Sequence, residues 1–224
     1  MPREYFRFLK KGKTMNISII GSGNVGGTLG RAWARRGHDI FFGVPRPRDA
    51  KTQDLLKALG TKGRAGTVAE AAKAGDIIVL ATPWSATRDA IQAAGNLAGE
   101  VLLDCTNPLT EDFTGLVLGH TTSGAEQVAK WAKGAKVYKA FNQIGFGIMA
   151  NPSFDGRRAV LFICGDDETH KPTVLQLATE TGFEAIDAGG LRIARLLEPY
   201  GMLWIHLAMV RGLGRDFAFG LLRR

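Results

Sequence analysis

The segment with the clearest chemical meaning is the glycine-rich turn over residues 21–26, which reads G-S-G-N-V-G. An apolar run, residues 16–20, precedes it, and a helical pattern follows directly. In that context Gly21 permits a tight turn, Gly23 lets the backbone approach a pyrophosphate, and Gly26 lets the helix pack on the strand. The free N–H groups at the helix start attract the anion. A dinucleotide site is therefore expected, rather than an ordinary turn, with contacts from Gly21, Ser22, Gly23, Asn24, Val25 and Gly26.

The end of the next expected strand, residues 39–44, indicates which dinucleotide is bound. An NAD site needs a carboxylate there, about 20 residues beyond the first glycine, for the ribose hydroxyls. This strand ends in F-F-G-V, and residues 45–48 read P-R-P-R, with Lys51 following. Arginine can bind a 2′-phosphate through two charge-assisted hydrogen bonds. Arg46 and Arg48 therefore predict NADP(H), with a solvated basic loop as the alternative.

Polar residues and prolines follow three later strands of the expected sheet. Because ligands bind at the carboxyl ends of strands in an open α/β sheet, we expect these residues to line the ribose and the nicotinamide. Each group alone could be an ordinary end of a strand, but three groups at one edge favour a site. The candidates are Thr82, Pro83 and Trp84 after one strand, Asn107 and Pro108 after the next, and Ala140, Phe141 and Asn142 after the third.

The elements that must position these residues alternate between apolar runs and helical stretches. This pattern predicts an α/β fold of the Rossmann type, a doubly wound and mainly parallel sheet with a small C-terminal α/β extension. Strands are expected over residues 16–21, 39–44, 64–68, 76–82, 101–107, 136–142, 159–165 and 183–187. Helices are expected over 24–36, 51–56, 68–74, 85–94, 123–132 and 168–181, and from residue 191 onward.

Three units are expected along the chain: a basic N-terminal extension over residues 1–14, an NADP-binding unit over 15–150, and a strand-helix-strand-helix unit over 151–224 that completes the substrate pocket. The extension is expected to be a loosely packed tail. The last helical stretch is apolar on all sides, so it should be buried in the protein, in a pocket wall or in a subunit interface. Pro199 and Gly201 are expected to kink or break it.

Composition and charge exclude several classes of protein. Of the 224 residues, 45% are hydrophobic and 22% charged, which is ordinary for a globular chain, and the net charge is +8 without a clustered nucleic-acid footprint. No apolar stretch approaches the ~20 residues that span a membrane, and the basic start lacks a signal-peptide region, so a cytoplasmic protein is expected. Cys105 and Cys164 fall in expected strands and are read as core residues in a reducing compartment. No residue spacing indicates a metal site.

The chain resembles the coenzyme F420-dependent NADP oxidoreductase family. The similarity covers almost everything from Met15 onward and is carried by I-G-S-G-N-V-G, A-T-P-W, K-A-F-N, I-C-G-D-D-E and D-A-G-G-L-R-I-A-R-L-L-E. The reductase domains of the six-transmembrane epithelial antigen metalloreductases share the glycine turn, the F-N strand end and the C-G-D segment. The family's 2′-phosphate loop often begins with Ser-Arg or Arg, whereas here Val44 and Pro45 precede Arg46.

This resemblance implies NADP(H) as cofactor, with coenzyme F420 or a flavin as second substrate, and a homodimer. Hydride transfer between two rings depends on positioning at about 3–3.5 Å rather than on a strong acid or base. No catalytic side chain is therefore expected. The candidates for the ring pocket are Phe141, Asn142, Ile144 and, from the last helix, Met202.

The second ring is expected between the strand end at residues 141–144 and the helix over 199–206, unless that helix only fills the core or a dimer interface. Two other activities fit the same residues. One is an NADPH-dependent reductase of flavin and ferric iron, or of a small carbonyl or imine. The other is a non-catalytic NADP-sensing protein.

Overall fold

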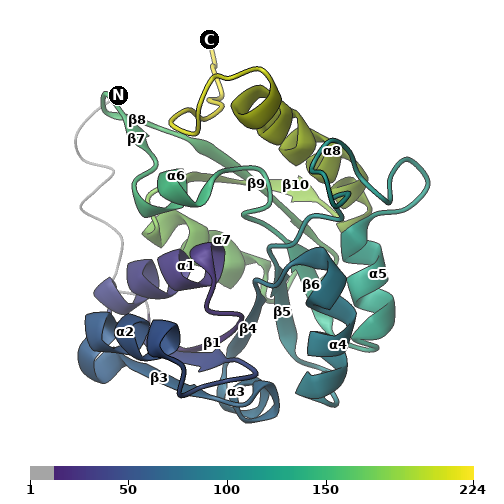
Figure 1. The fold of residues 1–224 in the computed structure, drawn as a ribbon. Coiled ribbons are helices and arrows are strands. Elements are labelled where there is room, and N and C mark those ends of the chain that lie inside the picture. The colour runs from purple at the N-terminus through teal and green to yellow at the C-terminus, as the bar shows by residue number, and fades with distance from the viewer. Residues whose placement is uncertain (1–12) are drawn as a thin grey trace.

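An eight-stranded sheet lies at the centre of the computed structural model, which describes residues 13–224 (Figure 1). The strand order is β10-β9-β6-β5-β4-β1-β2-β3. Strands β1 to β6 pair in parallel, β9 pairs antiparallel with β6, and β10 is parallel to β9. The strands are β1 Asn16–Ile20, β2 Asp39–Gly43, β3 Gly63–Gly66, β4 Ile77–Leu80, β5 Val101–Asp104, β6 Lys136–Lys139, β9 Val160–Gly165 and β10 Glu184–Gly189. The expected doubly wound, mainly parallel α/β fold is confirmed.

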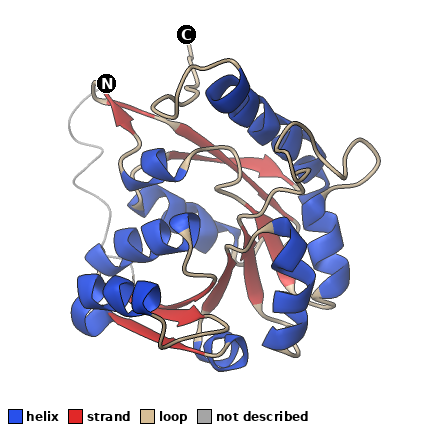
Figure 2. Cartoon of the chain, in the orientation of Figure 1, coloured by secondary structure: helices blue, strands red, loops and turns tan. Residues whose placement is uncertain are grey.

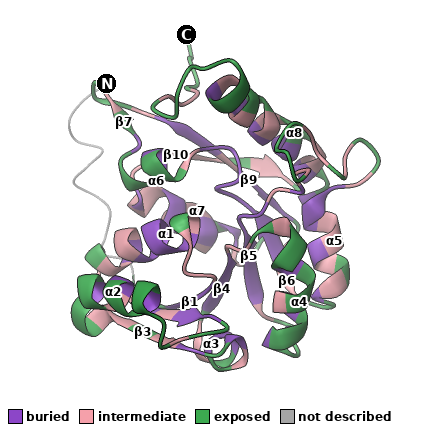
Figure 3. Cartoon of the chain, viewed as in Figure 1, coloured by how far each residue is buried: buried purple, intermediate pink, exposed green. Residues whose placement is uncertain are grey.

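Helices cover both faces of this sheet (Figure 2). Side chains of α1, α2, α6 and α7 share one buried apolar cluster with the strands, and those of α3, α4, α5 and α8 share the other. Strands β1, β4, β5, β6 and β9 are buried almost throughout, which explains why most of their residues are apolar, whereas β3 and β10 at the two edges of the sheet are mostly half-buried (Figure 3). The helices are α1 Asn24–Arg35, α2 Ala50–Leu59, α3 Val68–Ala74, α4 Trp84–Ala94, α5 Gly124–Trp131, α6 Phe146–Ala150, α7 Lys171–Glu180 and α8 Ala194–Ile205.

Two elements were not expected from the sequence. They are the short helix α6 and the hairpin of β7 (Ser153–Phe154) and β8 (Arg157–Arg158). Strands of two residues are too short to show an apolar pattern, and only the turn, Asp155 and Gly156 with φ of 48° and 80°, is visible in the sequence. The expected helices over 51–56 and 168–181 are also corrected, to Ala50–Leu59 and Lys171–Glu180.

The C-terminal residues extend the same sheet instead of forming a separate layer. Strand β9 pairs with β6 through Tyr138–Gly165 and Lys139–Cys164, and β10 pairs with β9. Because β9 is antiparallel to β6, the carboxyl ends of β9 and β10 lie at the edge opposite to those of β1 to β6. The predicted basic extension over 1–14 falls outside the described residues except for Lys13 and Thr14.

Helix α8 differs from the expected stretch in one respect. It is continuous through Pro199 and Gly201, and the irregular part is the π-helical turn His206–Val210 that follows. Its outer face is exposed in the single chain, with Leu196 at 66% and Leu203 at 47% of full exposure, so burial of this face in a subunit interface stays a prediction. Pro199 has no N–H to donate within the helix, and Leu197 and Gly201 on either side of it contact Asn142 at the sheet edge.

Both cysteines are buried and free. Cys164 lies in β9 and Cys105 directly follows β5. Burial raises the pKa of the Cys164 thiol to about 12, so it is protonated at neutral pH. Within residues 13–224, none of the helices has the length and apolar character needed to span a membrane.

Candidate functional site

The glycine turn has the backbone geometry that its sequence predicts. Gly21 adopts φ of +106°, and a Cβ there would lie 2.6 Å from the Ala81 carbonyl oxygen. A Cβ on Gly26 would lie 2.1 Å from the Gly21 carbonyl oxygen and 3.0 Å from the Ile19 side chain. The turn and the close helix–strand packing therefore require these two glycines, as expected.

The amino end of α1 is open. Its N-cap, Gly23, has no side-chain capping bond, and the first turn contains no acidic residue. A Cβ built on Gly23 meets nothing within 4 Å, so the space beside it is free for a ligand. Together with the helix dipole, this leaves the N–H groups of the turn ready to bind an anion.

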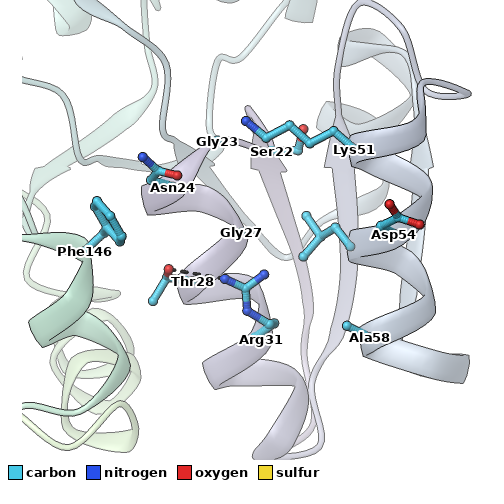
Figure 4. A pocket seen from close by; sticks show the side chains of 11 residues that line it. Ser22, Gly23, Asn24, Gly27, Thr28, Arg31, Lys51, Asp54, Ala58 and Phe146 are labelled. Atoms are coloured by element: carbon cyan, nitrogen blue, oxygen red, sulfur yellow. Dashed lines mark hydrogen bonds between the residues drawn. The ribbon is translucent and has the colours of Figure 1, made fainter.

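A hollow opens beside this turn between α1 and α2, with Phe146 of α6 at its other side (Figure 4). Lys51 extends across it toward Ser22, and Arg31 lies further along α1 (Figure 4). Arg31 was missed by sequence reasoning because it lies mid-helix, outside any motif. The hollow is lined by Ser22, Gly23, Asn24, Gly27, Thr28, Arg31, Lys51, Asp54, Leu55, Ala58 and Phe146.

The basic loop after β2 leaves its cations exposed. Arg46, Arg48 and Lys51 are all exposed, and Val44 before them is buried. The nearby acid, Asp49, caps α2 by accepting the Thr52 N–H at 2.7 Å, and the hydrogen bonds from Thr52 lower the pKa of this carboxyl. The loop therefore presents positive charge next to the glycine turn.

The end of β4 is half-exposed, but the ring of Trp84 packs against another residue of the protein. The Thr82 hydroxyl lies 3.0 Å from that of Thr87, and Pro83 is the exposed N-cap of α4. The Trp84 ring packs against Trp131 of α5 with centroids 5.3 Å apart. Thr82 and Pro83 thus present the freer surface at this strand end.

The ends of β5 and β6 are joined by a pair of asparagines. Asn107 Nδ2 donates to the Asn142 carbonyl oxygen at 2.6 Å, and Asn142 Nδ2 donates to Asn107 Oδ1 at 3.0 Å. Asn142 also donates to the Leu197 carbonyl oxygen at 3.0 Å, and its Oδ1 accepts from Gln143 Nε2 at 3.2 Å. Both amide hydrogens of Asn142 are used by the protein, so its amide N–H groups are not available to a cofactor.

The predicted ring pocket is corrected at Phe141. Its side chain is only 1% exposed and packs edge-on against Trp33 at 5.9 Å and Phe183 at 6.0 Å. Its φ of 61° turns the chain at the end of β6 and directs the side chain into the core. Ala140 is likewise buried, so both positions can reach a ligand only through the backbone.

The space predicted between residues 141–144 and α8 is also corrected, because the two elements are in direct contact. A Cβ on Gly201 would lie 2.7 Å from the Asn142 carbonyl oxygen, and one on Gly145 would lie 2.5 Å from the Trp204 ring. Ile144 is 8% exposed and Met202 is half-buried. The structure therefore leaves no space for a ring between these two elements.

A buried cluster of charges below the asparagine pair was not foreseen from the sequence. Lys139 Nζ lies 2.7 Å from Asp104 Oδ2 and 2.9 Å from Glu198 Oε1, and none of the three side chains is more than 1% exposed. Burial acts to lower the pKa of Lys139, but the two carboxylates outweigh it and raise the pKa above its usual range. Lys139 therefore stays charged inside the protein.

The second carboxylate of this cluster also occupies the start of a helix. Glu198 Oε2 and Oε1 accept the N–H groups of Gly124 and Ala125 at 2.7 and 3.0 Å. Glu198 is 74 and 73 residues away from these partners in the chain. No local motif could reveal this bond; the only signal was an acid within an otherwise apolar helix.

Comparison with known proteins shows which family the chain is similar to. Residues 16–108 match the family described as NADP oxidoreductase, coenzyme F420-dependent. The F420-dependent NADP reductase of Methanocaldococcus jannaschii is 29% identical over 207 residues, which cover 86% of this chain and 92% of that protein. The chain is therefore similar to members of the F420-dependent NADP oxidoreductase family, the same family that its motifs resemble. These matches support an oxidoreductase.

A metalloreductase is a further relative. Metalloreductase STEAP3 of Rattus norvegicus is 32% identical over 183 residues, which cover 81% of this chain but 35% of that protein. The chain therefore spans about a third of that relative's length, and the match concerns one part of the longer protein.

Solved structures agree on the fold. One from Arthrobacter sp. FB24, provisionally named an F420-dependent NADP reductase, superimposes with a TM-score of 0.83 at 29% identity, covering 93% of this chain and all of that one. A reductive aminase from Aspergillus terreus, in complex with NADPH and ethyl levulinate, gives a TM-score of 0.66 at 18% identity. It covers 89% of this chain and 64% of that chain, and it shows the fold alone.

Proposed function

We propose that this protein transfers a hydride between NADP(H) and a flavin-like ring, with the deazaflavin coenzyme F420 as the second substrate. The observation that carries the proposal is the open amino end of α1 at Gly23, beside exposed arginines and at the edge where β4, β5 and β6 also end. The near full-length similarity to the Methanocaldococcus reductase supports coenzyme F420 as the partner.

The adenine half of the cofactor is assigned to the β1–β2 side of the edge. The turn from Gly21 to Gly26 would hold the pyrophosphate on the N–H groups of α1. Arg46 and Arg48 would bind the 2′-phosphate, and Lys51 is placed to assist because it extends toward Ser22 (Figure 4). Exposed cations with no competing acid in the first turn of α1 support this assignment.

The nicotinamide half is assigned to the ends of β4, β5 and β6. Thr82, Pro83, Asn107 and Pro108 would line it, with Trp84 and the backbone of Ala140, Phe141 and Asn142 at its margin. When bound, the nicotinamide supplies or accepts the hydride, which is two electrons and one proton. The second proton of the flavin-like ring is exchanged with bulk water. The residues of the protein then need only hold the two rings at about 3–3.5 Å and keep water out.

The decisive experiment mixes purified protein with NADPH and, in separate samples, a deazaflavin, a flavin, a flavin with ferric iron, a cyclic imine, or no acceptor. Loss of NADPH absorbance that depends on the deazaflavin supports the proposal. Turnover only with flavin and iron would favour the activity named for the rat metalloreductase, to which this chain is 32% identical. Tight NADPH binding without turnover on any acceptor would leave a sensor of NADP as the function.

Two further parts of the proposal concern the setting of the reaction. We place it in the cytoplasm, since two buried cysteines without a disulfide suit a reducing compartment. We also propose a homodimer, because α8 and the turn after it expose Leu196, Leu203 and Met209 at 66%, 47% and 52%. Sedimentation of the unaltered protein and of Leu203→Glu tests the dimer; a monomer in both would reject it.

A further inference from the structure

We infer that Lys139 and Glu198 are positioning residues: Lys139 holds the segment that leads into Asn107, and Glu198 holds Asn107 at the cofactor edge through its partner Asn142. The inference rests on the proposed function. It divides the two asparagines, both of which the sequence marks as cofactor contacts: Asn107 faces the ligand and Asn142 orients it.

The hydrogen bonds of the pair carry this division. Asn142 is 4% exposed and spends both amide hydrogens on Asn107 and the Leu197 carbonyl oxygen. Asn107 is half-buried and makes two bonds, one from Nδ2 and one to Oδ1, both with Asn142. A carboxamide has two N–H groups and two lone pairs on oxygen, so Asn107 retains one of each. It can donate to and accept from a ligand at the same time, as a ribose or a carboxamide requires.

The charged cluster fixes the backbone on both sides of this pair. Lys139 Nζ donates to the Thr106 carbonyl oxygen at 2.8 Å, and Thr106 immediately precedes Asn107. The Asp104 carboxylate accepts from the Thr106 N–H at 2.9 Å and from its hydroxyl at 2.7 Å. The segment that leads into Asn107 is thus held by both members of the Lys139–Asp104 ion pair.

Glu198 performs the same task for Asn142. Its neighbour Leu197 provides the carbonyl that accepts from Asn142, and Gly201, on the same face of α8, lies against the Asn142 backbone. The Glu198 carboxylate binds Lys139 on one side and the first N–H groups of α5 on the other. Helix α8 is therefore seated against the ends of β5 and β6 by one buried charge.

The charges of the cluster are matched by the fold. One lysine faces two carboxylates, and the additional negative charge lies at the amino end of α5, where the helix dipole favours it. Without Lys139, two buried carboxylates would lack a counter-charge. Without the Glu198 carboxylate, Lys139 keeps only Asp104, and the Gly124 and Ala125 N–H groups lose their acceptor, so the position of α8 depends on Glu198. The consequence is confined to the nicotinamide half, because β4 separates β5 from the glycine turn after β1.

The test compares Glu198→Gln, which keeps the shape of the side chain but removes its charge, with Glu126→Gln as a matched control. Glu126 also joins α5 to α8, through Arg195 at 2.6 Å, but it contacts neither asparagine nor Lys139. For each variant we would measure kcat, the affinity for NADPH, and the affinity for adenosine 2′,5′-bisphosphate, which represents the adenine half alone.

Glu198→Gln is expected to lower kcat by about ten- to a hundredfold, because small displacements of reacting groups have effects of that size. Its affinity for the bisphosphate should stay within about twofold of the unaltered protein, since distant sites behave independently. Asn107→Ala should reproduce the loss of kcat, and Glu126→Gln should leave all three quantities unchanged. Asn142→Ala, which keeps Asn107 intact, should lower kcat by less than Asn107→Ala does but by more than Glu126→Gln does.

Two results would overturn the inference. One is an unchanged kcat in folded Glu198→Gln; the other is an affinity for the bisphosphate that falls in parallel with kcat, which would mean general loosening of the protein. If Glu198→Gln does not fold, Asn142→Ala and Asn107→Ala still decide, because the inference requires both to lower kcat. Failure of the proposed function is recognised separately, because the unaltered protein would then bind NADPH but reduce no acceptor. In that case a loss of affinity for NADPH in Glu198→Gln, with the affinity for the bisphosphate retained, would still test the positioning.

Discussion

Helices α1 and α5 begin in opposite ways, although each follows a strand that ends at the same edge of the sheet. The first N–H groups of α1 meet no side chain of the protein, and its N-cap is Gly23. Those of α5, at Gly124 and Ala125, donate to the buried carboxylate of Glu198. The same electrostatic preference for an anion is thus left open in one helix and satisfied internally in the other.

The difference shows how one property of a helix can support binding or architecture. At α1 the anion has to come from outside, which suits a ligand phosphate. At α5 the anion is a residue of α8, and the interaction fixes a C-terminal helix against the sheet. Each end can be tested by changing what occupies it.

The largest expected effect follows from filling the open end of α1. Gly23→Val should abolish NADPH binding, because the added side chain would fill the space that the pyrophosphate needs. The fold should remain intact, because a Cβ at this position meets nothing within 4 Å in the unaltered protein. Thermal unfolding with and without NADPH measures this. A ligand at a hundred times its Kd stabilises a protein by about 2.7 kcal/mol, and the variant should lose that gain. A variant that is still stabilised by NADPH would show that the pyrophosphate does not lie at Gly23.

The next largest effect is expected when the Glu198 carboxylate is removed from the amino end of α5. Glu198→Ala should lower the free energy of unfolding by about 3–5 kcal/mol, because Lys139 loses one of its two buried ion pairs and the buried N–H groups of Gly124 and Ala125 lose their acceptor. Urea unfolding measures the change, and Glu126→Ala serves as the control, since its carboxylate pairs with Arg195 closer to solvent. Equal losses of unfolding free energy in the two variants would mean that the buried cluster contributes no more to stability than the Glu126–Arg195 ion pair does.

A smaller effect is expected in the loop that supplies charge to the open end. Arg46→Ala should weaken NADPH binding by about 1.5–3 kcal/mol, roughly tenfold or more, because one charge-assisted contact to the 2′-phosphate is lost. The affinity for NADH should not change. Lys57→Ala, an exposed cation on α2 that pairs with Asp54, is the control for net charge. Equal affinity of the unaltered protein for NADPH and NADH would contradict the assignment of this loop.

The smallest effect is expected at the opposite edge of the sheet. There, hydrogen bonds from the His170 side chain and backbone lower the pKa of Asp167 from 3.8 to about 2. A carboxyl with a lowered folded-state pKa stabilises the protein above pH 4, and that contribution is lost as the pH falls toward 2. Asp167→Asn should therefore destabilise the protein slightly at pH 7 and not at pH 2, as measured by denaturant unfolding. NADPH affinity should be unaffected, and a change in it would mean that the two edges are coupled.

The parts of the molecule that the sequence predicted correctly are those whose causes lie close together in the chain. The turn at Gly21 and the packing at Gly26 depend on a few neighbouring residues, and both agree with the structure. The central strands β1, β4 and β5 were recognisable because burial on both faces makes their sequences mostly apolar. Strands β9 and β10 extend the sheet, in agreement with the expected C-terminal α/β extension.

The corrected parts depend on contacts between distant segments. Phe141 was expected to face a ligand, but its φ of 61° and two aromatic neighbours, Trp33 of α1 and Phe183 just before β10, place it in the core. Helix α8 was expected to leave space for a ring, and Gly201 instead brings it against Asn142. The Lys139–Glu198 pair joins two segments that no spacing rule connects, so only the folded chain shows it.

The seat of Glu198 has a consequence for how the protein is made. Asp104, the start of α5 and Lys139 emerge from the ribosome before α8 has been synthesised. Until then, the nascent chain holds a lysine and a carboxylate in its sheet without the residue that completes their cluster, and α5 lacks its anion. Domains generally fold as units during synthesis, but here the last helix has to arrive before the nucleotide-binding unit is finished. A chain cut after residue 150 should accordingly fail to fold, even though it retains the complete glycine turn and the basic loop.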